Sequence, residues 1–392
     1  MIGQNSTIGV IMTDFHNMMN TELPMLLALP TKIIRKIEFL KIVSFLLTIF
    51  ISDLAFANPT FGVTPNAETP PVVTGDDAAD DPAIWVNRAN PALSLIFGTD
   101  KKSGIYVYDI NGEELSYSKL GKVNNVDLRE KDNKLHLVMS NRTKGSIDYW
   151  VFDTNGLHDY FQSKPVDSFS EEIQHQQIDT GMSVYGICVG IINNELHAAI
   201  TEEEGVSVQQ WNLNASVKTH QIDITEYELP PEVIGNEAEG CVYDDENKTI
   251  FISREGDKGI LKAYQAETFD LIAEVDSREG NIVGDPEGVA IYKNTEKDGF
   301  IILSSQGSSE FKIYERLNPY EFIGTFAIAD TDAIDGVQDT DGIAVTSEPL
   351  PGYPKGLLVV QDGENKSLDG RMINQNFKFV SFEKVISNLL DK

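Results

Sequence analysis

The residues best suited to chemistry in this chain are carboxylates that recur in a short phrase. Each copy has a polar residue, a turn-forming residue and then a brief apolar run. A weaker copy, Asn125-Val126-Asp127-Leu128, falls near the place expected for the second. Pro82 and Gly342 are 260 residues apart, or five intervals averaging 52, and a period near 50 indicates an array of similar supersecondary units. The clear copies are Asp81-Pro82-Ala83-Ile84, Tyr185-Gly186-Ile187-Cys188, Glu239-Gly240-Cys241-Val242, Glu287-Gly288-Val289-Ala290 and Asp341-Gly342-Ile343-Ala344.

These carboxylates predict a site for cations. If Asp81, Glu239, Glu287 and Asp341 gather in one place, their like charges must raise their pKa values or be balanced by counter-ions. A ligand set that is all oxygen, without cysteine or a histidine cluster, favours hard ions. Flexible loops with carboxylate and amide groups favour Ca²⁺ over Mg²⁺ or Zn²⁺. The alternative is that such ions only hold loops together.

Basic residues beside the acids point to an anionic substrate. Lys101 and Lys102 stand in one predicted hairpin loop and Arg142 in the next, and phosphate is the natural partner of a site that combines cations with Lys and Arg. Taken singly, each could be an ordinary surface ion pair. The chain has no Arg-His-Gly, Cys-x5-Arg or Gly-x-Ser-x-Gly phrase, so water activated by a metal is the remaining route to phosphate ester hydrolysis.

Six predicted β-hairpins would position these residues. Each has an apolar strand, a polar turn and a strand of alternating apolar and aromatic residues. Six phrases and six hairpins predict an all-β fold, a six-bladed β-propeller in which the phrases are turns entering the innermost strands and the hairpin loops form a second ring at the same face. The hairpins begin at residues 95, 135, 196, 250, 301 and 357.

The N-terminal part reads as an extension and export signal rather than as fold. Lys32, Arg35, Lys36 and Lys41 precede an apolar run, residues 42–51, and Ala55-Phe56-Ala57 predicts cleavage after Ala57. A retained membrane anchor is the alternative, and residues 1–24 differ enough from a signal that Met25 is a candidate start. We expect an exported protein, periplasmic or secreted, with no membrane contact after cleavage.

Residues 58–392 are expected to form a single propeller domain. The chain has 31 Lys and Arg against 61 Asp and Glu, a net charge of −30, which disfavours nucleic acid and anionic membranes as partners. Solubility alone could account for scattered acids. Cys188 and Cys241 follow the phrases of two neighbouring units, and either a disulfide or two buried thiols fits this placement.

At these residues the chain resembles the β-propeller phytases, also called alkaline phytases. The strongest marker is residues 77–85, Asp-Ala-Ala-Asp-Asp-Pro-Ala-Ile-Trp, followed by Lys101-Lys102-Ser103-Gly104. The similarity extends from about Glu68 to Phe382. Further phrases that agree in order include Ser140-Asn141-Arg142, Val184-Tyr185-Gly186, Asp285-Pro286-Glu287-Gly288, Ser304-Ser305-Gln306-Gly307, Asp339-Thr340-Asp341-Gly342 and Gln361-Asp362-Gly363-Glu364-Asn365.

The resemblance implies a 3-phytase type phosphoric monoester hydrolase acting on phytate, myo-inositol hexakisphosphate. It implies several calcium ions, attack by a calcium-bridging water, and a monomer. Lys101, Lys102 and Arg142 would bind substrate, and the reaction would take place at Tyr185, Glu239, Asp285, Glu287 and Asp341. The calcium ligands implied are Glu68, Asp80, Asp81, Tyr185, Glu239, Glu255, Asp285, Glu287, Gln306, Asp335, Asp341, Glu364 and Asn365.

One departure from the family lies in the third hairpin loop. Well-known members carry Gly-Lys-Glu-Gly there, whereas this chain has Glu202-Glu203-Glu204-Gly205. Exchange of a cation for acids should weaken phosphate binding unless Arg254 or another ion takes its place. Two further interpretations therefore stay open: a degenerate propeller that binds calcium and a partner, and a propeller hydrolase for another ester or lactone.

Overall fold

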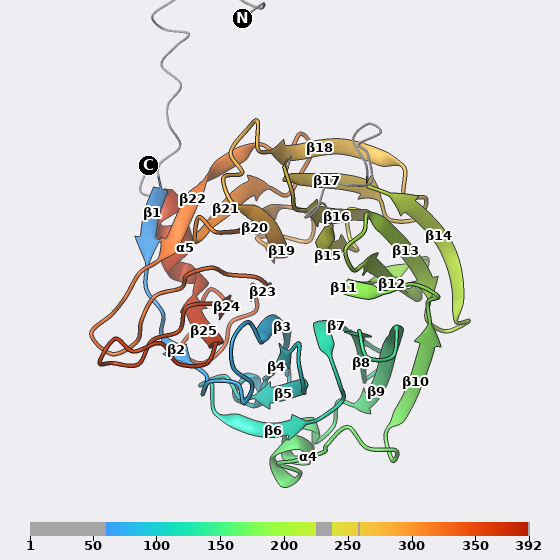
Figure 1. The fold of residues 1–392 in the computed structure, drawn as a ribbon, viewed down its shortest axis with the longest axis horizontal. Helices are drawn as coiled ribbons and strands as arrows, with labels where there is room; N and C mark the ends of the chain where they lie inside the picture. The colour runs from blue at the N-terminus through green and yellow to red at the C-terminus, as the bar shows by residue number, and fades with distance from the viewer. Residues whose placement is uncertain (1–59, 225–236, 258, 391–392) are drawn as a thin grey trace, which may run out of the picture. The chain divides into compact units, whose positions relative to one another are not determined.

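The computed structural model describes residues 60–224, 237–257 and 259–390, and the predicted extension and signal, residues 1–57, lie outside this part of the chain. Within it, six small sheets are arranged in a ring (Figure 1), which confirms the prediction of a six-bladed β-propeller. The six predicted hairpins are the second and third strands of the six blades.

The first three blades follow one another along the chain, and each sheet has its strands in sequence order. Blade 1 contains β3 (Ala79–Trp85), β4 (Leu95–Asp100), β5 (Gly104–Tyr108) and β6 (Glu114–Ser118). Blade 2 contains β7 (Val123–Lys131), β8 (Lys134–Asn141), β9 (Ser146–Asp153) and β10 (Gln174–Asp179). Blade 3 contains β11 (Val184–Ile192), β12 (Glu195–Glu202), β13 (Ser207–Asn212) and β14 (Val217–Asp223).

The last three blades complete the ring. Blade 4 contains β15 (Ala238–Asp244), β16 (Thr249–Arg254), β17 (Ile260–Gln265) and β18 (Leu271–Ser277). Blade 5 contains β19 (Asp285–Lys293), β20 (Gly299–Gln306), β21 (Glu310–Glu315) and β22 (Phe322–Ile328). Blade 6 takes only three strands from this end of the chain, namely β23 (Ile343–Thr346), β24 (Leu357–Asp362) and β25 (Asn376–Ser381).

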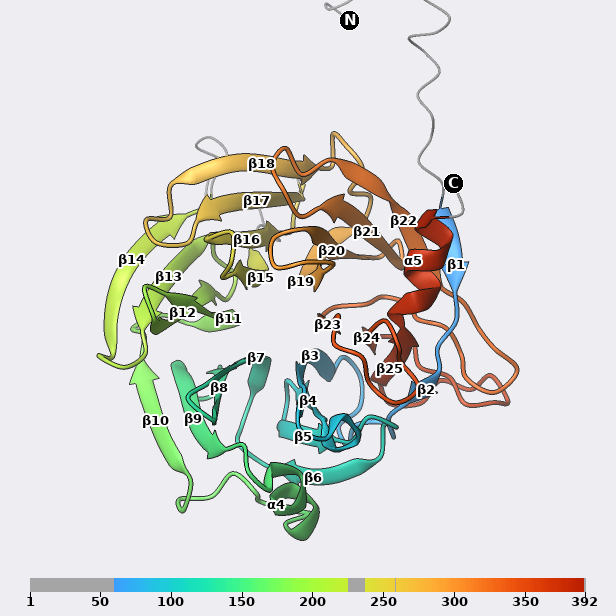
Figure 2. The same ribbon diagram turned by 180° about the vertical axis from the view of Figure 1, so that it is seen from behind.

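The start of the described chain supplies the missing edges. β2 (Ala67–Glu68) pairs antiparallel with β25 as the fourth strand of blade 6, and β1 (Thr60–Val63) adds a fifth, parallel strand to blade 5. Figure 2 shows β1 beside α5 (Phe382–Leu390), the helix that follows β25, and β2 beside β25. The two ends of the domain thus close the ring together, a feature that sequence reasoning did not predict.

The acidic phrases lie within or beside the innermost strands, and not in turns that precede them. β3, β7, β11, β15 and β19 each contain an irregularity in register at the phrase, for example between Ala79 and Pro82. A β-bulge of this kind redirects side chains and ends regular pairing. The prediction of simple turns is therefore wrong in detail, although the phrases do mark the first strand of each blade.

The repeated glycine lets neighbouring inner strands approach closely. A Cβ atom at Gly240 would lie 2.5 Å from the carbonyl oxygen of Glu287, and one at Gly288 would lie 2.9 Å from that of Asp341. Ser253 and Ser304 bridge the same pairs of blades, because their hydroxyls donate to the carbonyls of Glu287 at 2.6 Å and Asp341 at 2.7 Å. The ring is therefore held together at the residues that carry its carboxylates.

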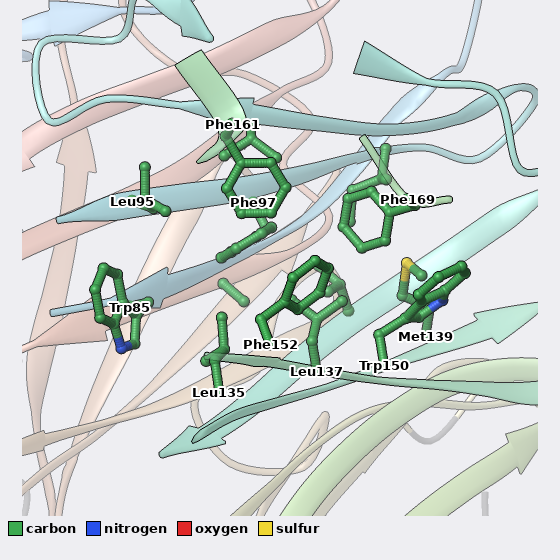
Figure 3. Close-up of a cluster of buried hydrophobic side chains, with 14 of the residues drawn as sticks. Trp85, Leu95, Phe97, Leu135, Leu137, Met139, Trp150, Phe152, Phe161 and Phe169 are labelled. Atoms are coloured by element: carbon green, nitrogen blue, oxygen red, sulfur yellow. The ribbon is translucent and has the colours of Figure 1, made fainter. Parts of the chain in front are cut away.

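Apolar side chains fill the space between adjacent blades. Figure 3 shows the cluster between blades 1 and 2, where Phe97, Trp150 and Phe152 are buried. Phe161 of the short helix α4 (Leu157–Ser163) covers it, with its ring centroid 5.7 Å from that of Phe97. The described residues also include a single helical turn, η1 (Pro91–Leu93). No helix among the described residues is long and apolar enough to cross a membrane.

A disulfide joins the innermost strands of blades 3 and 4. Cys188 of β11 and Cys241 of β15 are bonded, with their Cα atoms 5.6 Å apart. Of the two states that the sequence left open, the structure therefore shows the disulfide, and the cross-link reinforces one of the six contacts around the ring.

Candidate active site

Five carboxylates of the inner ring are almost completely buried. Asp80 and Asp81 belong to β3, Glu239 to β15 and Glu287 to β19, and Asp341 stands just before β23; their exposed fractions lie between 5% and 8%. They come from blades 1, 4, 5 and 6, and the ring brings them together.

Lys101 lies among three acids, two of which, Asp80 and Asp341, belong to this buried set. Its Nζ is 2.8 Å from Asp77, 3.1 Å from Asp80 and 3.2 Å from Asp341. Burial alone would lower the pKa of Lys101, but Asp80 and Asp341 outweigh it and the pKa is raised. Lys101 is therefore a fixed, permanently charged cation at the mouth of the ring.

Arg142 and Tyr185 form the basic and aromatic side of the site. The guanidinium lies over the Tyr185 ring, 5.2 Å from its centroid, and Nη1 donates to Asn124 Oδ1 at 3.1 Å. Asn124 in turn donates to Asp80 at 3.3 Å. The other end of the guanidinium pairs with Glu203, so the acid that departs from the family contacts the predicted phosphate ligand directly.

A third part of the site is a cluster of three glutamates. Glu237, Glu239 and Glu255 each place one carboxylate oxygen within 4.8 Å of the other two. Glu237 was not predicted, although the repeat marks its position: it stands two residues before Glu239, just as Asp285 stands two residues before Glu287. Its carboxylate also accepts a hydrogen bond from the backbone of Glu204 at 2.5 Å.

Electrostatics favour a bound cation here. Burial raises the pKa of Glu239 well above its usual range, and the neighbouring charge of Glu287 raises it further. Burial likewise raises the pKa of Glu287, with Asp341 as the next cause. Neither residue forms an ion pair with Lys, Arg or His in the part of the chain that the structure describes. An all-oxygen donor set with excess negative charge suits a hard cation such as calcium.

The remaining predicted ligands near this site are Asp285, Gln306 and Tyr185. Gln306 donates to the carboxylate of Asp341, and Asp285 pairs with Arg278. Burial and the charge of Glu239 raise the pKa of the Tyr185 phenol, so its hydroxyl keeps its proton. Arg254, considered as a replacement cation, is buried, and its Nη1 donates to the carbonyl of Ile224 at 3.1 Å.

Four predicted ligands lie elsewhere. Glu68, Asp335 and Asn365 gather around the buried ammonium of Lys378, which is 3.0 Å from Asn365 Oδ1 and 3.4 Å from Asp362. Glu364 lies beside Lys366 at 3.5 Å. Lys102 also turns away from the carboxylates, because its Nζ donates to the carbonyl of Gly75 at 2.8 Å. The structure thus divides the predicted ligand set into two groups.

Comparisons with known proteins show to which family this chain belongs. The family model described as Phytase matches residues 32–392. The chain belongs to the phytase family. The enzyme is 36% identical to a 3-phytase from Bacillus subtilis (strain 168) over 341 residues, which cover 84% of this chain and 86% of the relative.

A solved structure supports only the fold of this phytase. An auxiliary nutrient binding protein from Bacteroides thetaiotaomicron matches with a TM-score of 0.50 and 12% identity, over 82% of this chain and 76% of the other. At that identity the likeness shows a shared architecture and carries nothing about chemistry.

Proposed function

We propose that this phytase hydrolyses phytate to lower inositol phosphates and phosphate, and that calcium held by the inner-ring carboxylates is required. The observation that carries the proposal is the burial of Glu239, Glu287 and Asp341 together, beside the fixed cations Lys101 and Arg142. Buried acids without enough counter-charge are costly, whereas acids arranged around a cation are stable.

The chain's own residues have separable roles in this proposal. Asp80, Asp81, Glu239, Glu255, Asp285, Glu287 and Asp341, with Gln306 and Tyr185, would hold calcium. Bound calcium would neutralise the substrate's negative charge and lower the pKa of adjacent water. A second group of predicted calcium ligands, Glu68, Asp335, Glu364 and Asn365, belongs to blade 6. Calcium held there would stabilise the blade, where Lys378 already supplies one positive charge.

Phosphate binding is assigned to Lys101 and Arg142. Three carboxylates already fix the Lys101 side chain, so Lys101 loses no further side-chain entropy when it binds a phosphate group. Arg142 Nε is a buried donor without an acceptor among the described residues, which leaves the guanidinium with unsatisfied donor capacity for an anion. Tyr185, held neutral below the guanidinium, would donate a hydrogen bond to a phosphate oxygen.

The cellular context also belongs to the proposal. Disulfides persist in oxidising compartments, so the Cys188 to Cys241 bond supports export, whether to the periplasm or the medium. We propose that residues 1–57 are removed on export and that the enzyme acts as a monomer.

The experiment that tests calcium-dependent hydrolysis is phosphate release from phytate by protein stripped with a chelator. We expect no release in the chelator and recovery on titration with CaCl₂ but not with NaCl of equal ionic strength. Full activity in the presence of the chelator would refute the calcium requirement. No release at saturating calcium would refute phytate as the substrate.

A further inference from the structure

Arg278 connects two segments that carry proposed calcium ligands. Its Nε donates to the carbonyl of Gly256 at 2.8 Å, its Nη1 donates to the carbonyl of Val283 at 2.7 Å, and its Nη2 pairs with the carboxylate of Asp285. Gly256 directly follows Glu255, and Asp285 is the first residue of β19. One guanidinium therefore contacts the backbone next to one ligand and the side chain of another.

The backbone is shaped to hold this arginine. The amide of Arg278 donates to the carbonyl of Gly259 at 3.0 Å. A Cβ atom on Gly259, whose φ is +27°, would lie 2.9 Å from Arg278 Nε, so a larger residue there would displace the side chain. The Arg278 side chain is 28% exposed. The planar guanidinium of arginine can donate to these three acceptors at once, whereas the single ammonium of lysine cannot.

We propose that Arg278 is a positioning residue that holds Glu255 and Asp285 in the arrangement calcium needs. This inference rests on the proposed function. Without the guanidinium contacts, bound calcium itself would have to order the two segments. The free-energy cost of that ordering would weaken calcium binding. The positive charge of Arg278 acts in the opposite direction, because it repels calcium. A test must therefore change the geometry and keep the charge.

Arg278→Lys is that change, and calcium affinity measured by calorimetry on the full domain without substrate is the readout. We expect the dissociation constant to rise roughly fivefold, as for the loss of one or two hydrogen bonds. At saturating calcium, kcat and KM for phytate should stay close to wild type. The matched control is Arg371→Lys, an equivalent exchange at an exposed arginine that pairs with Asp369 at 2.8 Å, and it should change nothing.

An Arg278→Lys protein that binds calcium as tightly as wild type, or more tightly, would overturn the positioning role. Wild-type protein that binds no calcium would instead overturn the proposed function, so the two failures are distinct. Circular dichroism checks that each variant is folded. If Arg278→Lys does not fold, Gly259→Ala disturbs the same contact with Arg278 retained and must weaken calcium binding in the same direction.

Discussion

Lys101 Nζ lies 3.2 Å from Asp341 Oδ2, although the two residues are 240 positions apart in the chain. One follows the second strand of blade 1 and the other precedes the first strand of blade 6, so their contact exists only because the ring closes. The site is therefore assembled only when the ring of blades closes.

Asp341→Asn should disable the enzyme without unfolding it. The exchange keeps the shape but removes a charge proposed to hold calcium and known to contact Lys101, so we expect kcat for phytate to fall at least about 100-fold. Because the pKa of Asp341 is raised to about 8 by burial, removal of its charge should not lower the melting temperature measured without calcium.

The control for that variant is Asp369→Asn, an exposed acid that pairs with Arg371. It should keep wild-type kcat. Retention of more than half the activity by Asp341→Asn would contradict a role for this carboxylate at the site.

Glu203→Gln should improve substrate binding. Glu203 pairs with Arg142, so an incoming phosphate must compete with a carboxylate for the guanidinium. Removal of the charge should lower KM for phytate by roughly threefold to tenfold, with little change in kcat. Steady-state kinetics at fixed, saturating calcium measure both constants.

Glu204→Gln is the comparison, because Glu204 is the exposed neighbour of the same charge. A rise in KM for Glu203→Gln would mean that Glu203 orients Arg142 productively rather than competing with substrate. Arg142→Ala should raise KM by about tenfold, and the effect of Glu203→Gln should then disappear in the double variant.

Much of the ring could be predicted from the sequence, since a period near 52 with one hairpin per unit leaves few other folds. The residues brought together by repetition, such as Glu239 and Glu287, were likewise foreseeable. Closure by β2 was not, because a two-residue strand, Ala67–Glu68, carries no pattern.

Two residues of the site were missed for different reasons. Glu237 lies on the repeat, at the same offset from Glu239 as Asp285 from Glu287, so the sequence could have marked it. Arg278 is revealed only by its contacts with neighbouring loops. Glu68, Asp335 and Asn365 lie apart from the inner-ring carboxylates. This separation could not be predicted either, because it depends on the N-terminal strand that closes blade 6.

Stability without calcium should fall as the pH rises. Burial raises the pKa of Glu255 to about 7 from an ordinary value of 4.5, and that of Asp341 to about 8 from 3.8. Between the ordinary and the raised values the folded state holds more protons than the unfolded state, so unfolding becomes easier as pH increases. Thermal melting in a chelator should show the loss between about pH 5 and pH 8.

Calcium should remove that dependence, because the ion replaces the protons as the partner of the carboxylates. Equal melting temperatures at pH 5 and pH 8 in the chelator would contradict the electrostatic description of the ring.

Loss of the disulfide should loosen the contact between blades 3 and 4. The bond closes a loop of 53 residues, for which the chain-entropy model gives about 4 kcal/mol of stabilisation. A Cys188→Ala, Cys241→Ala double variant should therefore melt at a lower temperature, and the wild type should show the same decrease after reduction. An unchanged melting temperature in both experiments would mean that the ring is held by packing alone.

Anomalous diffraction from a calcium-soaked crystal would show whether the inner-ring carboxylates hold calcium. We expect anomalous peaks within coordination distance, about 2.3 to 2.6 Å, of oxygens of Glu239, Glu287 and Asp341. An active crystal with calcium bound only at the Glu68 and Asp335 group, and none at the inner ring, would show that these carboxylates do not bind the ion that activity requires.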